Sequence, residues 1–96
     1  LTVDVAAICR QLPRGNAALA DQLKRASASV VLNFAEGYSR TTKRERRRFF
    51  DIARGSTFEV VAVLDVLQAL DLIGLDSWRA STKTAEDLSR MLWAFK

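Results

Sequence analysis

The sequence contains no histidine, one cysteine, one proline and four glycines among its 96 residues. Without histidine, the most common general base and the Glu-x-x-His motif of metal-binding helical bundles are both excluded. Cys9 lacks a second cysteine for a disulfide within the chain, and it lacks a histidine partner for nucleophilic catalysis or a zinc site. We therefore expect a protein that is not an enzyme and that holds neither a metal nor a cofactor.

Long apolar runs are also missing. No stretch of about eighteen apolar residues occurs, which argues against a membrane-spanning helix. The first residues lack the basic, apolar and small-residue regions of a signal peptide, and the scarcity of cysteine fits a reducing compartment. We expect a cytoplasmic protein without a membrane partner. Because the sequence starts at Leu1 rather than at methionine, we also expect a few native residues to precede it.

The composition that is present suits one small globular domain over residues 1–96. Hydrophobic residues make up 49% of the chain and charged residues 27%, which is typical of a folded chain rather than a disordered one. The formal net charge of +4 indicates a nucleic-acid or acidic partner only weakly, because many soluble proteins share such a charge. The position of the charge is therefore more informative than its sum.

Apolar residues recur every three or four positions in four segments, which predicts four helices. Their expected bounds are about 1–12, 17–36, 43–72 and 77–95. Pro13 separates the first two segments, and Gly74 precedes the last one. Four helices with short connections predict an all-α, up-down-up-down antiparallel four-helix bundle with a long third helix.

Several residues mark the expected ends and contacts of the helices. Gly37 is expected to end the second helix in the left-handed conformation. Thr42 and Glu45 have the spacing of a capping box at the start of the third helix. The pair Gly55-Ser56 lowers helix propensity inside the third helix, so we expect it to permit the close approach of a neighbouring helix.

The third helix carries apolar residues on two sides. The side expected to face the core carries Phe49, Ile52, Ala53, Ser56, Val60, Val63, Leu64, Leu67 and Leu70. The opposite side carries Phe58, Val61, Ala62 and Leu72 in its second half. A helix that is apolar on both sides has to be covered on both, so we expect the second set to pack against another subunit. The alternative is that the fourth helix and the chain ends cover it.

The fourth helix is expected to place one apolar face against the core. This face carries Trp78, Ala85, Leu88, Leu92 and Phe95, with Met91 beside them. Trp78 and Trp93 are interpreted as core or interface anchors rather than as platforms for stacked bases.

The strongest chemical signal is the run from Arg40 to Arg48, which contains six basic residues and one acidic residue, Glu45. Cations in the first turn of a helix oppose its macrodipole, so stability does not account for them. Arginine side chains beside a helix N-terminus suit phosphate groups. We expect contacts with the backbone of RNA or DNA from Arg40, Lys43, Arg44, Arg47, Arg48 and Arg54. A solvated face, or a protein-interaction scaffold whose cations meet an acidic protein, are the alternatives.

A second polar group consists of Asn33, Glu36, Ser56 and Glu59, which border the apolar stripes of adjoining helices. Buried polar groups need hydrogen-bond partners, so we expect a structural cluster that fixes the register of the two central helices.

The stretch from residue 33 to residue 59 resembles a known family. The residues that carry the resemblance are Asn33-x-Ala35-Glu36-Gly37, the basic run, and Phe49-x-x-x-Ala53-x-Gly55-Ser56-x-x-Glu59. They are similar to the 23S rRNA intervening sequence proteins, a family of small cytoplasmic bacterial four-helix bundles. The resemblance implies a ring-like homopentamer. The sequence departs from the family in having Val31-Leu32 where an Ile-Pro pair is common.

The chain is also similar to the accessory variability proteins of diversity-generating retroelements. These are basic pentamers that bind nucleic acid and a reverse transcriptase. The similarity therefore implies self-association, a nucleic acid and a reverse transcriptase or other protein as candidate partners.

Overall fold

The computed structural model describes residues 1–94, and these residues form four helices without a strand. The helices are α1 (Thr2–Gln11), α2 (Ala17–Ser39), α3 (Lys43–Ala69) and α4 (Leu75–Ala94). The prediction of an all-α protein with four packed helices is confirmed. The expected helix end at residue 95 and the expected core position of Phe95 lie outside the described residues.

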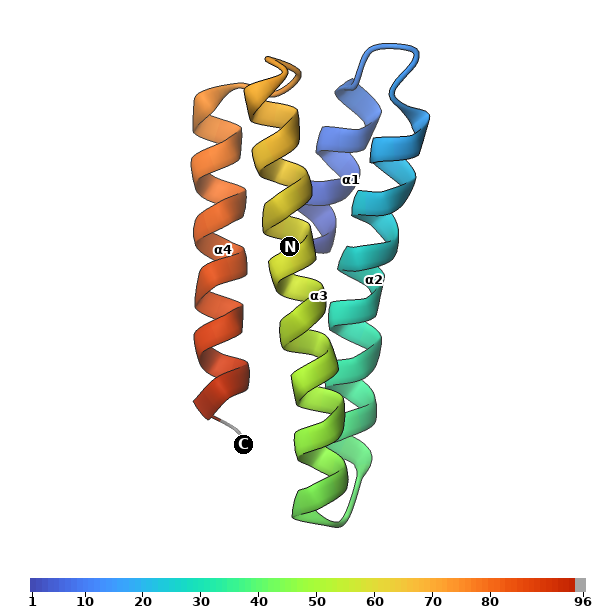
Figure 1. The fold of residues 1–96 in the computed structure, drawn as a ribbon, viewed down its shortest axis with the longest axis vertical. Helices are drawn as coiled ribbons and strands as arrows, with labels where there is room; N and C mark the ends of the chain where they lie inside the picture. The colour runs from blue at the N-terminus through green and yellow to red at the C-terminus, as the bar shows by residue number, and fades with distance from the viewer. Residues whose placement is uncertain (95–96) are drawn as a thin grey trace.

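The helices pack around α3. It contacts α2 on one side and α4 on another, and the contact with α2 is the more extensive of the two. The shorter α1 packs mainly against α2. Figure 1 places the loops between α1 and α2 and between α3 and α4 at one end of the molecule, with the loop between α2 and α3 at the other. The α2–α3 hairpin extends beyond the nearby end of α4 (Figure 1), and the molecule measures 44 × 21 × 18 Å.

Two groups of buried side chains hold the helices together. The larger group joins α1, α2 and α3 through Val5, Ile8, Leu23, Ala26, Val30, Val60, Val63, Leu64 and Leu67. The smaller group lies nearer the free end of the hairpin and consists of Phe50, Ala53 and Leu92, with Phe34 packed against it. Among the described residues, the smaller group anchors the part of the hairpin that α1 does not reach.

The buried side of α3 differs in part from the prediction. Phe49 is half-buried, and Ile52 and Leu70 are 42% and 59% exposed, so their assignment to the core is wrong. Phe50 and Thr57 are buried instead. Because both α2 and α4 cover α3, the buried arc is displaced toward positions 50 and 57, and positions 52 and 70 fall at its exposed edge. The Thr57 hydroxyl donates to the Ala53 carbonyl at 2.9 Å, which satisfies it inside the helix.

Gly37 lies within α2, which continues to Ser39, so the prediction that Gly37 ends the helix is wrong. Gly37 is buried where α2 packs against α3. A Cβ atom at this position would lie 2.6 Å from Cε1 of Phe50 and 3.2 Å from the Cβ of Phe49. The expectation that Gly55 permits a close approach is also wrong, because no atom of another described helix lies within 4 Å of a Cβ built there. The two central helices approach closely at Gly37, and of the predicted pair it is Ser56 that contacts α2, through the Ser29 hydroxyl at 2.6 Å.

The end of α3 lies at Ala69, before the predicted end at residue 72. Asp71 adopts the left-handed conformation with φ of 60°. Its amide donates to the Gln68 carbonyl at 3.0 Å, and the Leu72 amide donates to the Leu67 carbonyl at 2.8 Å. This pattern is a Schellman motif. The left-handed position of this motif is commonly glycine, but here it is Asp71. The nearest glycine, Gly74, comes three residues later. The sequence therefore predicted an end of the helix beyond the true one.

Replacing Asp71 with glycine is expected to raise the free energy of unfolding by about 0.5–1 kcal/mol. Glycine adopts the left-handed conformation without the steric cost that a side chain imposes there. Thermal unfolding followed by circular dichroism should show a melting temperature higher by roughly 2–8 °C. Asp71→Val should lower it, and equal melting temperatures for the two variants would contradict this account of the helix end.

Candidate functional site

The α3 tip, defined here as Lys43, Arg44 and Arg47, lies at the free end of the α2–α3 hairpin. The preceding Thr42 has an extended backbone, and its hydroxyl accepts a hydrogen bond from the Glu45 amide at 3.3 Å. This bond fixes the start of α3, as the capping pattern in the sequence indicates. The helix therefore begins with its basic residues already in the first turns.

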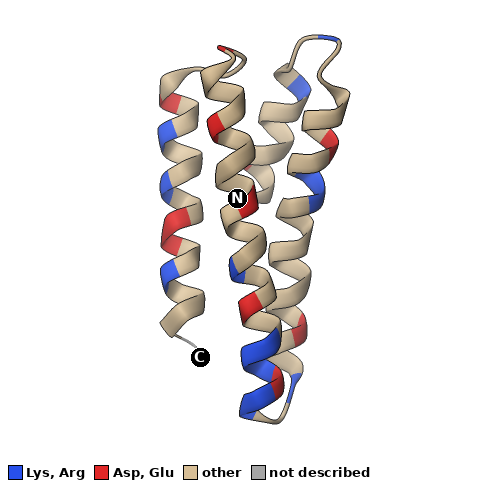
Figure 2. Cartoon of the chain, viewed as in Figure 1, with Lys and Arg blue, Asp and Glu red and all other residues tan. Residues whose placement is uncertain are grey.

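The side chains of the α3 tip are exposed, and none of them forms an ion pair or hydrogen bond with another side chain among residues 1–94. Figure 2 shows Lys and Arg gathered at this end of the molecule. Three cations without counter-ions, at a helix end that favours anions, constitute a surface that an external anion can neutralise.

Two further predicted residues, Arg40 and Arg48, are positioned by contacts within the hairpin. Arg40 forms an ion pair with Glu36 at 3.0 Å between Nη2 and Oε2. The Arg40 and Arg48 guanidinium carbons lie 5.0 and 5.6 Å from the centre of the Phe49 ring. Arg46, which was not among the predicted residues, donates from Nε to the Arg40 carbonyl at 2.7 Å. These contacts orient the cations, and exposed pairs of this kind add little stability.

Arg54 lies apart from the tip, against α4. Its guanidinium carbon is 5.4 Å from the centre of the Phe58 ring and 4.5 Å from that of Trp93. Its Nε atom is buried and has no hydrogen-bond partner among the described residues. Arg54 lines a hollow together with Ser89, Arg90 and Trp93 of α4. We name these four residues the α3–α4 hollow. The three residues from α4 carry no local sequence signal that links them to Arg54, because the contact depends on helix packing.

Asn33 and Ser56 of the predicted polar group are joined through Ser29, which was not among the predicted residues. Asn33 donates from Nδ2 to the Ser29 carbonyl at 2.8 Å and to the Ser29 hydroxyl at 3.0 Å. The Ser29 and Ser56 hydroxyl groups share a hydrogen bond of 2.6 Å, which links α2 to α3. Glu36 instead pairs with Arg40, and Glu59 is exposed. Ser29 lies four residues before Asn33 on the same helix face, and this spacing was a usable signal.

Some of the residues predicted to form a subunit interface lie on the surface, and one packs against the core. Phe58 is 55% exposed, Ala62 is exposed and Val61 is half-buried. Phe58 and Val61 line a groove that Ala85 of α4 also lines, so α4 covers part of this side. Leu72 packs against the larger buried group rather than standing on the outer side with the other three residues.

A second apolar groove opens between α2, α4 and the start of α1. It has a volume of 250 Å³. Its lining consists of Leu1, Thr2, Val30, Val31, Phe34, Leu88, Met91 and Leu92. Val31 and Met91 are 51% and 40% exposed, so apolar surface remains accessible here.

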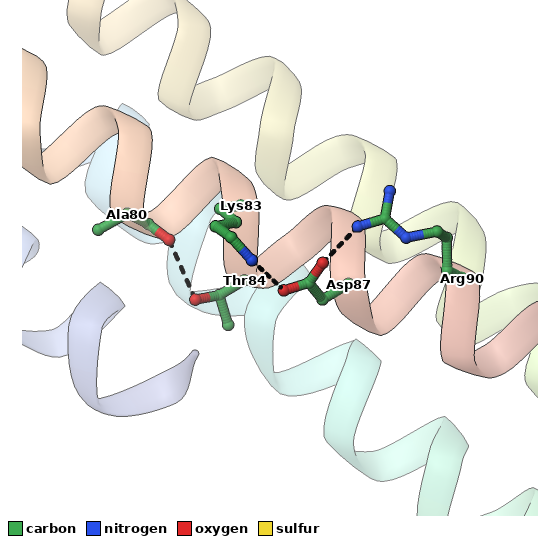
Figure 3. Close-up of polar contacts among 5 residues, drawn as sticks. All are labelled: Ala80, Lys83, Thr84, Asp87 and Arg90. Atoms are coloured by element: carbon green, nitrogen blue, oxygen red, sulfur yellow. Dashed lines mark hydrogen bonds and ion pairs between the residues drawn. The ribbon is translucent and has the colours of Figure 1, made fainter.

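Local polar contacts run along α4 (Figure 3). Asp87 accepts a hydrogen bond from Lys83 at 3.0 Å and another from Arg90, and the Thr84 hydroxyl donates to the Ala80 carbonyl at 3.0 Å. The hydrogen bonds from Lys83 and Arg90 lower the pKa of the Asp87 carboxyl below its usual value. Arg90 donates to Asp87, and it forms no other ion pair among residues 1–94.

The remaining reactive group is Cys9, and its environment makes it a weak nucleophile. Burial raises the pKa of the thiol, which keeps it protonated at neutral pH. The sulfur atom lies 3.7 Å from the Ala20 carbonyl oxygen, to which the thiol donates. Within residues 1–94, no three histidine, cysteine, aspartate or glutamate side chains gather in a group that could bind a metal ion. None of the described helices has the length and hydrophobicity needed to cross a bilayer.

Comparison with known families agrees with the resemblance drawn from residues 33–59. The family described as 23S rRNA-intervening sequence protein has a sequence model that matches residues 1–94. The match covers all four helices. No curated protein sequence matches the chain.

Proposed function

We propose that this chain, which belongs to the 23S rRNA-intervening sequence protein family, is a non-enzymatic protein that binds the phosphate backbone of RNA or DNA. The observation that carries the proposal is the α3 tip. Lys43, Arg44 and Arg47 are exposed and without counter-ions among residues 1–94, at a position where their charge does not help the fold.

The helix N-terminus adds neutral donors to this charge. The amides of Lys43 and Arg44 precede the first intrahelical hydrogen bond, which runs from the Arg46 amide to the Thr42 carbonyl at 3.1 Å. Amides in the first turn lack intrahelical acceptors and point toward solvent. A phosphate oxygen can therefore accept from an amide while the side chains neutralise its charge. Such contacts read the backbone and not the bases.

The proposed assembly is a homo-oligomer, which the resemblance specifies as a pentameric ring. Each chain would be an up-down-up-down antiparallel bundle whose long third helix carries the tip. Two apolar surfaces support self-association: the exposed side of α3 around Phe58 and Ala62, and the groove that contains Val31 and Met91. They lie on different parts of the molecule. Contact between two unlike surfaces is heterologous, and such contacts form a ring where the rotation between subunits closes. In a ring, the field of each tip adds to that of its neighbours.

The test is the salt dependence of binding by the unmodified protein to a structured RNA. If each chain contacts three phosphates, affinity should fall about 40-fold between 50 and 200 mM salt, from a slope of about −0.9 per contact. Fluorescence anisotropy with a labelled RNA and its scrambled sequence should give equal affinities. Absence of binding at the lower salt concentration would refute the proposal. Light scattering on the same sample measures the oligomer, and a monomer at micromolar concentration would refute the assembly.

A protein-interaction scaffold is the second candidate function. The accessible apolar groove around Val31 and Met91 favours it, because apolar surface contributes nothing to binding a phosphate backbone. In this alternative the cations meet an acidic protein, such as an acidic face of a reverse transcriptase. Binding of a purified acidic partner that persists after nuclease treatment, and that Met91→Glu abolishes, would favour the scaffold.

A further inference from the structure

Arg54 is a half-buried cation, and no carboxylate among residues 1–94 forms an ion pair with it. Its guanidinium group lies between the rings of Phe58 and Trp93, at 5.4 and 4.5 Å from their centres. Its Nε atom is buried without a hydrogen-bond partner, and Arg54 forms no ion pair with any residue among 1–94. Aromatic faces stabilise a cation but accept no hydrogen bond from it in the plane of the guanidinium group. Among residues 1–94 the guanidinium group of Arg54 thus has no anionic partner, and an oxyanion in the hollow would supply one.

The other residues of the α3–α4 hollow complete a binding surface. Arg90 brings a second guanidinium group and Ser89 a hydroxyl group, and the residue Trp93 is 57% exposed. Asp87 holds one donor of Arg90, and Glu86 lines the adjoining groove. The hollow has a volume of 390 Å³, within the range of roughly 300–1,000 Å³ that is usual for small-molecule sites.

The hollow lies further along α3 than the tip, and Asp51 stands between them on the same helix face. Arg54 follows Arg47 by seven residues, which is two turns of helix and about 10.5 Å along the axis, on the same face of α3. A polyanion that lies along this face from the tip would reach the hollow. Figure 2 shows basic and acidic residues alternating along α3 beyond the tip and along α4.

We infer that the α3–α4 hollow binds one unpaired nucleotide of the nucleic acid whose backbone contacts the α3 tip. Arg54, Arg90 and the Ser89 hydroxyl hold its phosphate, and its base stacks on the exposed surface of the Trp93 ring. The inference rests on the proposed function and narrows its substrate to single-stranded or looped segments. Cations interleaved with exposed aromatic rings are typical of single-strand sites, because every unpaired base offers a face for stacking. The bases of a duplex are already stacked and gain nothing from such a ring.

The experiment uses the full chain with Trp78→Phe, which leaves Trp93 as the only tryptophan. A ten-nucleotide single strand and a ten-base-pair duplex are titrated at low salt, and tryptophan fluorescence is recorded. The single strand should quench Trp93 and the duplex should not. Arg54→Gln should weaken single-strand binding about tenfold, as expected for the loss of a charge-assisted phosphate contact. Duplex binding through the tip should change less than twofold. Arg90→Gln provides a second variant if Arg54→Gln does not fold.

The matched control is Arg79→Gln, which removes the same charge from α4 outside the hollow. It should leave both affinities within twofold of the parent. Equal single-strand and duplex affinities together with an unchanged Trp93 signal would overturn the hollow as a nucleotide site while the proposed function stands. If Arg54→Gln lowered the affinity for both ligands tenfold or more, the nucleotide site would also be overturned, because the hollow would then contact only backbone. A parent protein that binds neither ligand would overturn the hollow and the proposed function together.

Discussion

A charge-reversed tip, with Lys43→Glu, Arg44→Glu and Arg47→Gln, is expected to lose nucleic-acid binding while the protein becomes more stable. Binding should weaken roughly a hundredfold or more at low salt, because three phosphate contacts are lost and two repulsive charges replace them. Anisotropy titrations with a labelled RNA measure this loss. The salt dependence of any residual binding should be correspondingly shallow.

The gain in stability has a separate cause. Lys43 and Arg44 occupy the first turn of α3, where the partial positive charge of the helix repels cations and attracts carboxylates. Each reversal should contribute about 0.3–1 kcal/mol, and a glutamate at position 44 also faces Arg48 at the favourable four-residue spacing. The melting temperature should rise by a few degrees, and it should do so less at high salt. Lower stability would show that the tip cations serve the fold.

The control for this variant makes the same change in charge elsewhere. Lys24→Glu, Arg25→Glu and Arg79→Gln also lower the net charge by five, from +4 to −1, on exposed positions of α2 and α4. This protein should keep most of its affinity if the tip is the binding surface. An equal loss in both triple variants would mean that net charge alone attracts the nucleic acid.

Gly37→Val is expected to be the most destabilising single substitution on the hairpin. The added Cβ would lie 2.6 Å from a ring atom of Phe50, and Phe50 is only 4% exposed and stacked on Phe34 with 5.7 Å between ring centres. The ring cannot move without disturbing that packing. We expect a loss of about 2–3 kcal/mol, which lowers the melting temperature by roughly 8–24 °C.

The matched control is Gly55→Val, at an exposed helical position with no atom of another described helix within 4 Å of the new Cβ. Valine and glycine differ little in helix propensity, so its stability should change by less than about 0.5 kcal/mol. Adding Phe50→Leu to Gly37→Val should restore part of the loss by removing the ring. Both proteins have to be compared at one concentration, since self-association shifts the apparent stability. Equal effects at the two glycines would contradict the close packing at Gly37.

Local chemistry made some features of the hairpin predictable. The hydroxyl of Thr42 and the spacing to Glu45 mark the start of α3 in the sequence, and the structure places the capping hydrogen bond there. Periodicity likewise located the four helices and most of the buried positions. It could not separate Phe49 from Phe50, because the direction of burial depends on where α2 and α4 lie around α3. The same limit applies to Gly37, whose role depends on the ring that faces it.

The candidate site was predictable only where it belongs to one stretch of sequence. The α3 tip is contiguous, so its charge is visible before folding. The α3–α4 hollow is not, since Ser89, Arg90 and Trp93 meet Arg54 only after α4 packs on α3. The helix end at Asp71 was missed for another reason. Its left-handed conformation occurs at an aspartate, and residue type alone favours glycine for that role.

The extension of the α2–α3 hairpin beyond α4 also bears on how the protein moves. Local opening costs least where few buried contacts have to break. Past the group formed by Phe50, Ala53 and Leu92, the described part of the chain contributes two helices, α2 and α3. The last turns of the hairpin can fray and reclose while the four-helix part stays folded. Amide hydrogens there should exchange with solvent faster than those around Leu64, which is fully buried. The cations at the tip are thus carried on a segment that can adjust to an irregular line of phosphates without unfolding the domain.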